Sequence, residues 1–284
     1  MSFFKKFTDL ILFGNIYVAI GTACLIQSTI IQLGSNDHLI FYSLLSFFAT
    51  LFIYNFQRIF YKPQQDISLH SIRRKWIFEN QFTIKILSGI GFSGVGITFF
   101  YNDPKIIYYL SPLLILSLAY FIPYIKLRKS PWFKLLTLVI VWTMVTAVVP
   151  VLLSNSESFT KNNILHIAVR FTFMMAICIP FDIRDLIIDE ADNVSTLPHL
   201  FGENKTRNIA VFFMLIYITL IVAEYITGML NTKIFAVLLV SALINGVLVL
   251  MSNSKRSEYF YVAGIDGTMI LQGVMLMGVQ LWCQ

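Results

Sequence analysis

Four carboxylates lie close together where a long apolar segment meets a polar one, and they are Asp182, Asp185, Asp189 and Asp192. Each residue turns a helix by about 100°, so this spacing places the four side chains within an arc of roughly 80° and turns Arg184 away from them. Clustered carboxylates repel one another, and a bound divalent cation would explain why they converge. Mg²⁺ is the cation we expect, because it binds few protein carboxylates and completes its coordination with water and substrate phosphate oxygens.

The composition indicates where such a site must lie. Apolar residues make up 57% of the 284 residues and charged residues 13%, with 26 phenylalanines and a mean hydropathy of +0.74. A chain this apolar would be insoluble as a globule, and its apolar stretches recur at about 20 residues, the length of a helix that crosses a bilayer. We therefore expect an all-α, polytopic membrane protein.

Nine apolar segments are long enough to cross the membrane, and they are residues 10–32, 38–60, 80–101, 105–125, 133–154, 163–181, 208–228, 232–251 and 259–281. We expect these transmembrane helices to form a single domain, residues 1–284, around a central cavity. The longest polar connectors are the second, residues 58–79, and the sixth, residues 182–207. These two connectors are predicted to carry the chemistry and to form a cap.

Lysine and arginine are distributed unequally between the two sides of the predicted bundle. Of the 21 residues, sixteen lie on the side of the N-terminus and the even-numbered connectors, and three lie on the other side, namely Lys105, Lys161 and Lys233. Because cytoplasmic loops are enriched in these residues, we expect the N-terminus and the Asp-rich connector to be cytoplasmic, with the protein in the cell (inner) membrane. The net charge of +6 then reflects topology and attraction to anionic lipids, without any need for nucleic acid.

The Asp-rich connector has a recognisable pattern, D-x-x-D-x-x-x-D preceded by an aromatic residue and followed by T-L-P and a glycine. The residues in these places are Phe181, Asp182, Asp185, Asp189, Thr196, Leu197, Pro198 and Gly202. This pattern resembles the second Asp-rich motif of the UbiA superfamily of intramembrane prenyltransferases. Two coarser features agree with the resemblance. The superfamily has nine spans, and its fourth span ends in tyrosine followed by basic residues, here Tyr120, Tyr124, Lys126 and Arg128.

The resemblance implies a function. Members with both Asp-rich motifs bind an isoprenyl diphosphate through Mg²⁺ ions, ionise its C–O bond and join the allylic cation to an aromatic or other lipophilic acceptor. By this resemblance, the residues that hold Mg²⁺ and act in catalysis are Asp182, Asp185 and Asp189, and those that bind the substrate include Asn55, Tyr124, Lys126 and Arg128. The expected partners are an isoprenyl diphosphate, a lipophilic acceptor and membrane lipids.

The first Asp-rich motif is incomplete. It has the form N-x-x-x-D-x-x-x-D at the end of the second span, and here Asn55 is followed by Ile59 and Pro63 at the two Asp positions. Half of the usual metal cage is therefore missing. An alternative interpretation follows from this loss, namely a non-catalytic UbiA-like protein that binds lipids or a partner. A transporter would instead show Gly- or Pro-broken helices in matched halves, and the prolines do not form such a repeat.

Two basic residues lie where the missing aspartates would have projected. Arg58 and Lys62 follow Asn55 by three and seven residues, on the same helical face. We hypothesise that Arg58, with Lys62 and the basic cluster at residues 73–75, contacts the diphosphate directly, because a guanidinium offers phosphate a positive charge in place of a metal. The simpler interpretation is that these residues only mark the cytoplasmic end of a span, and it applies equally to Lys126 and Arg128.

Ionisable residues also occur inside predicted spans. Arg170 lies about 18 Å along the helix before Asp182, and an arginine at this depth is costly unless it has a partner. We expect it to pair with Glu224 as a structural contact. Asp266 lies about two turns inside the last span, where it either faces the cavity and orients an acceptor or hydrogen-bonds across a helix interface beside two glycines.

Overall fold

The structure is a computed structural model that describes residues 3–34, 39–60, 71–121, 130–154, 160–192 and 194–282, with the backbone alone described for residues 118–121. Within these ranges the chain consists of helices and short connections, without a strand. The helices are α1 (Phe3–Phe13), α2 (Ile16–Leu33), α3 (Ile40–Ile59), α4 (Ile72–Glu79), α5 (Gln81–Phe99), α6 (Ile106–Phe121), α7 (Pro131–Thr143), α8 (Val149–Leu153), α9 (Lys161–Arg184), α10 (Leu186–Ala191), α11 (Leu197–Phe201), α12 (Glu203–Ile226), α13 (Thr232–Leu250) and α14 (Gly267–Leu281). Two π-helical turns, Met144–Val148 and Phe260–Ile265, precede α8 and α14.

In the described part of the chain, eight helices are long and apolar enough to cross a membrane. They are α2, α3, α5, the continuous segment Pro131–Leu153, α9, α12, α13 and the segment Phe260–Leu281. The remaining prediction, residues 105–125, corresponds to α6, which has a shorter apolar stretch, Ile106–Ser117. The all-α, polytopic architecture is confirmed, and the central cavity stays a prediction.

The first predicted span, residues 10–32, is interrupted near its start. Asn15 has φ of 62°, in the left-handed region that a helix does not continue through. A Cβ on the preceding Gly14 would lie 2.3 Å from the carbonyl oxygen of Leu10, so the break requires glycine at this position. The span therefore begins at Ile16, and α1 forms a separate short helix.

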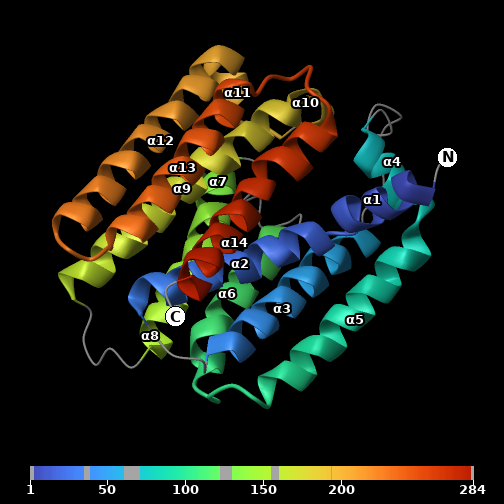
Figure 1. Ribbon diagram of the computed structural model, residues 1–284. Helices are drawn as coiled ribbons and strands as arrows, with labels where there is room; N and C mark the ends of the chain where they lie inside the picture. Colours follow the sequence, from blue (N-terminus) through green and yellow to red (C-terminus); the bar gives the residue numbers. More distant parts are fainter. Residues whose placement is uncertain are drawn as a thin grey trace.

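Helix α9 is the most enclosed span of the bundle. Of its most apolar stretch, 67% is buried, against 28% in α12 and in α13. It packs along α12 and α7, while α14 packs along α2 and α3 packs along α5 (Figure 1). Helices α3 and α5 approach closely because Gly91 has no side chain, since a Cβ there would lie 2.6 Å from the backbone nitrogen of Phe52. A side chain at the end of α9 is thus surrounded by protein on several sides.

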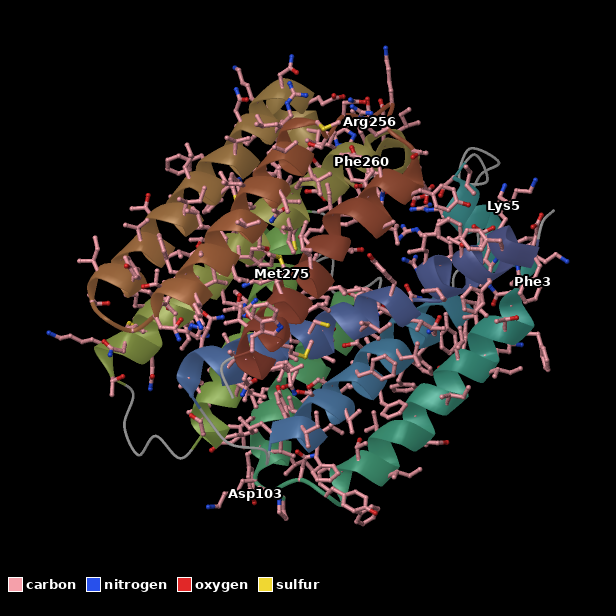
Figure 2. All side chains as sticks on the ribbon, in the orientation of Figure 1. Phe3, Lys5, Asp103, Arg256, Phe260 and Met275 are labelled. Atoms are coloured by element: carbon pink, nitrogen blue, oxygen red, sulfur yellow. The ribbon has the colours of Figure 1, made fainter. Side chains whose placement is uncertain are left out.

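The short helices α4, α10 and α11 gather at one end of the bundle, which we call the capped end (Figure 1). A salt bridge of 3.2 Å between Arg74 Nη1 and Asp192 Oδ2 joins the second connector to the sixth. The described parts of the two predicted connectors therefore meet at this end of the bundle, and their closure over a cavity stays a prediction. Figure 2 shows Lys5 and Arg256 toward the capped end and Asp103 at the opposite end.

Candidate functional site

The Asp-rich segment lies at the capped end, where α9 ends and α10 begins. Arg184 is the last residue of α9, Leu186 is the first of α10, and Asp185 lies between them. Pro180 in the last turns of α9 lacks an N–H and removes one helical hydrogen bond. The four aspartates are therefore distributed over α9, α10 and the single residues that follow each helix. The single anionic arc stays a prediction.

Two of the carboxylates converge on a lysine from another helix. Lys134 lies in the first turn of α7, and its Nζ is 2.9 Å from Asp182 Oδ1 and 2.8 Å from Asp189 Oδ2. The exposed fractions of the side chains are 14% for Lys134, 8% for Asp182 and 5% for Asp189. Burial raises the pKa of Asp189, and the charge of Lys134 opposes this shift. The three groups therefore form a buried, charged cluster.

Sequence reasoning did not identify Lys134 as part of the site. It was one of sixteen basic residues on the predicted cytoplasmic side. The sequence places Lys134 at the start of an apolar segment, on the same side of the membrane as the Asp-rich motif. This position does not indicate which residues Lys134 contacts. The packing of α7 against α9 brings Lys134 to the carboxylates.

The geometry around Lys134 Nζ fits a cation site. Two carboxylate oxygens, from Asp182 and Asp189, approach one buried position. The other oxygen of Asp182, Oδ2, is also buried and has no hydrogen-bond partner among the described residues. In the same ranges, no three acidic, histidine or cysteine side chains gather as a metal-binding group. A metal here would therefore use two aspartates and complete its coordination with water and phosphate oxygens, as Mg²⁺ commonly does.

Asp185, the middle aspartate of the motif, is held by its neighbour in the sequence. Arg184 Nε and Nη2 donate to its two carboxylate oxygens, both at 2.7 Å. The guanidinium also lies over the rings of Phe181, at 4.8 Å, and Tyr261, at 5.9 Å. Burial alone would raise the pKa of Asp185, but Arg184 and more distant cations lower it well below its ordinary value. The prediction that Arg184 points away is wrong for Asp185, whose assignment to Mg²⁺ stays a prediction.

Asn55, the remaining residue of the first motif, makes contacts only of a structural kind among the described residues. Its side chain is buried, and its amide nitrogen donates to the carbonyl oxygens of Gly14 at 3.0 Å and Leu51 at 2.8 Å. Its amide oxygen accepts a hydrogen bond of 3.0 Å from Asn15. These bonds tie α3 to the break between α1 and α2, and the contact of Asn55 with phosphate stays a prediction.

Arg58 lies in the last turn of α3, one turn after Tyr54. The hydroxyl of Tyr54 accepts a hydrogen bond of 3.2 Å from Trp142 Nε1 on α7. Side chains four residues apart share a helical face, so Arg58 is on the face of α3 that is turned toward α7, which also carries Lys134. Four other assigned residues lie outside the described residues and stay predictions, namely Lys62, Tyr124, Lys126 and Arg128.

Asp266 directly follows the π-helical turn Phe260–Ile265, and such turns are common at functional sites. Its carboxylate is close enough to Arg184 and to Tyr17 of α2 for electrostatic interaction. Arg184 belongs to the Asp-rich site and Tyr17 to a neighbouring helix, so both interpretations of Asp266 stay predictions.

A second group of polar side chains lies in the bundle away from the capped end, and we call it the distal polar cluster. Its members are Ser28, Thr29, His166, Arg170 and Glu224. Glu224 Oε1 lies 3.3 Å from His166 Nδ1, and Arg170 Nη2 donates to Thr29 Oγ1 at 3.2 Å. The predicted ion pair between Arg170 and Glu224 is therefore not formed, because His166 takes the carboxylate and Arg170 turns to α2.

The comparisons with known proteins agree on the fold. No family profile and no curated protein matches the sequence. A UbiA homologue from Archaeoglobus fulgidus, solved with GPP and Mg²⁺, matches the structure with a TM-score of 0.67 and 12% identity, over 95% of this chain and 98% of that one. The apo UbiA homologue from Aeropyrum pernix K1 gives a TM-score of 0.65 and 14% identity, over 94% and 98%. Digeranylgeranylglyceryl phosphate synthase gives 0.57 and 15%, over 97% and 99%.

These likenesses cover nearly the whole chain although few residues are identical. The chain therefore has the UbiA fold, and the resemblance predicted from the Asp-rich motif is confirmed at the level of the fold.

Proposed function

We propose that this protein transfers an isoprenyl group from an isoprenyl diphosphate to a lipophilic, aromatic acceptor inside the membrane. The observation that carries the proposal is the convergence of Asp182 and Asp189 on one buried cation position in a UbiA fold. The Archaeoglobus fulgidus homologue with this fold binds GPP and Mg²⁺, and we carry this substrate class and this metal to the present chain. The capped end is cytoplasmic in this proposal, as the excess of basic residues predicts.

The chemistry requires stabilisation of a leaving anion. The C–O bond of the isoprenyl diphosphate breaks, its electron pair leaves with the diphosphate, and the acceptor carbon forms the new bond and loses a proton. Mg²⁺, held by Asp182 and Asp189, would neutralise charge on the departing diphosphate. Basic side chains around the site serve the same purpose, because fixed charges in a water-poor pocket stabilise a developing anion strongly.

The residues of the chain divide this work between them. Asp182 and Asp189 bind the metal, and Lys134 and Arg58 provide positive charge from α7 and α3. The bidentate bond from Arg184 keeps Asp185 in one orientation. Asp266, whose carboxylate interacts electrostatically with Arg184, is the residue assigned to orient the acceptor.

Binding of GPP to the purified protein tests the proposal. We expect saturable binding that requires Mg²⁺ and that weakens at least tenfold in Asp182→Asn, because this change removes one anionic ligand without changing the size of the side chain. Asp103→Asn, at the opposite end of the bundle, is the matched control and should bind as the wild type does. Binding that is indifferent to Mg²⁺ and to Asp182→Asn would contradict the proposal.

A non-catalytic role is the second candidate, and one observation favours it. The described aspartates of the motif already contact protein cations, since Lys134 holds Asp182 and Asp189 while Arg184 holds Asp185. A protein that had lost its metals could be stabilised in this way and bind a lipid without reacting with it. Binding of GPP that does not depend on Mg²⁺, without any product across a panel of lipophilic aromatic acceptors, would support this role.

A further inference from the structure

The geometry of the Asp-rich site points to an exchangeable cation. We infer that Lys134 is the resident counter-ion of Asp182 and Asp189 when no metal is bound, and that it turns to the diphosphate when metal and diphosphate bind together. The inference rests on the proposed function, because it concerns how that site is loaded. Its basis is the position of Lys134 Nζ, 2.9 Å and 2.8 Å from the two carboxylates that would bind the metal.

Charge explains why a cation must be present at this point. Two buried carboxylates repel each other, and each would be costly to bury without a partner. A single ammonium between them leaves one negative charge uncompensated, and the second oxygen of Asp182 is buried without a hydrogen-bond partner in the described ranges. A divalent ion would neutralise both carboxylates and use this oxygen, so the site is better matched to a charge of two than to the charge that Lys134 supplies.

The same geometry predicts that metal alone binds poorly. A metal cannot share the position of Lys134 Nζ, so its binding displaces an ammonium whose side chain is only 14% exposed. Without diphosphate, the displaced ammonium loses both carboxylates and lies beside a second cation. With diphosphate, it gains phosphate oxygens as new partners. Metal and diphosphate should therefore bind cooperatively, and Lys134 is the residue that couples them.

The neighbouring ion pair shows why Lys134 is the exchangeable cation. Arg184 makes two hydrogen bonds of 2.7 Å to Asp185 and lies over two aromatic rings, so its guanidinium is fixed by several contacts. Lys134 presents a single ammonium on a flexible four-carbon stem, which can be redirected without breaking a planar arrangement. The site thus combines one fixed pair with one movable cation.

Titration with Mn²⁺, followed by the electron paramagnetic resonance signal of the free ion, tests this inference. The wild type should bind Mn²⁺ weakly alone and at least tenfold more tightly with GPP. Lys134→Met should bind Mn²⁺ alone at least tenfold more tightly than the wild type, and GPP should no longer strengthen binding to the same degree. Lys105→Met, which removes an exposed lysine at the opposite end of the bundle, should behave as the wild type does.

A second variant keeps the test decisive if Lys134→Met does not fold. Lys134→Arg retains the charge but can bind both carboxylates with a rigid fork, so Mn²⁺ should bind more weakly than to the wild type at an unchanged melting temperature. If the wild type binds Mn²⁺ with GPP but neither variant changes the affinity for Mn²⁺ alone, the exchange does not occur. If the wild type fails to bind GPP while Lys134→Met gains a Mn²⁺ site, the proposed function fails and the counter-ion role of Lys134 stands.

Discussion

The Asp-rich site and the distal polar cluster both place charged side chains inside the helical bundle, but they compensate those charges differently. At the Asp-rich site, carboxylates meet protein cations at 2.7 to 2.9 Å, and the side chain of the exchangeable cation, Lys134, is 14% exposed. In the distal polar cluster, Arg170 is 3% exposed and Glu224 is fully buried. The hydrogen bonds of Arg170 go to neutral oxygens of α2, at 3.2 to 3.4 Å.

This difference indicates that the Asp-rich site serves ligand binding and that the distal polar cluster serves the stability of the fold. Ion pairs that water and ions can reach are exchangeable, so they suit a site that must accept a metal and an anion and later release them. Contacts in a sealed cluster cannot be replaced from solution, and breaking them leaves charges buried in a medium of low dielectric constant. Substitutions at the exchangeable contacts of the Asp-rich site should therefore change binding and activity, whereas substitutions in the distal polar cluster should change stability.

The largest expected effect is on the reaction itself. Asp182→Asn should lower the rate of prenyl transfer from GPP to a lipophilic aromatic acceptor by about 10²- to 10³-fold, the usual cost of losing one charge-stabilising group at a reacting centre. Its melting temperature should change little, because Lys134 retains Asp189 as a partner. A variant that loses activity and stability together would remove the distinction between the two regions.

The second effect concerns the distal polar cluster. Arg170→Met should lower the free energy of unfolding by about 2 to 3 kcal/mol, because it removes the buried hydrogen bonds from the guanidinium to Ser28 and Thr29 and leaves their oxygens without this donor. Thermal unfolding in detergent measures this change, and Lys85→Met, an exposed lysine within a span, is the control. Binding of GPP well below the melting temperature should stay within twofold of the wild type. If the folded Arg170→Met variant lost most of its GPP binding, the distal polar cluster would be part of the substrate-binding site.

Features that depend on local sequence could be predicted, and features that depend on tertiary packing could not. Apolar length is a local property, so eight of the nine predicted spans correspond to helices long enough to cross a membrane in the described part of the chain. The spacing of the four aspartates likewise predicts a cation site from local sequence alone. The break between Arg184 and Leu186 was not visible in that spacing, because an interruption of one residue changes the direction of side chains without changing the count. The pairing of Arg184 with Asp185 was missed for this reason.

Contacts between helices that are distant in the sequence also could not be predicted. Lys134 lies 48 residues before Asp182 in the sequence, and its partners depend on how α7 packs against α9. His166 illustrates the same point, since the sequence offered two opposite charges, Arg170 and Glu224, but the carboxylate of Glu224 lies against His166. The residues could be named from the sequence, but their partners are set by tertiary packing.

A smaller effect is expected at the fixed ion pair of the Asp-rich site. Arg184→Lys keeps the charge but loses one of two hydrogen bonds to Asp185 and the contact with two aromatic rings. The free energy of unfolding should fall by about 1 to 2 kcal/mol, as for the loss of one charge-assisted hydrogen bond. Thermal unfolding measures the loss, and an unchanged melting temperature would show that the pair is as exchangeable as the contacts of Lys134.

The smallest effect is expected at the salt bridge between Arg74 and Asp192 at the capped end. This pair is more exposed than the ion pairs of Lys134 and Arg184, with 26% of the Asp192 side chain accessible. Arg74→Gln and Asp192→Asn should each lower the free energy of unfolding by less than about 1 kcal/mol, and a double-mutant cycle isolates the coupling between them. Because the pair joins two connectors and does not contact Asp182, both variants should bind GPP within twofold of the wild type. If Arg74→Gln alone weakens GPP binding tenfold, Arg74 contacts the diphosphate, as hypothesised for the basic cluster at residues 73–75, and the exchangeable region extends into the cap.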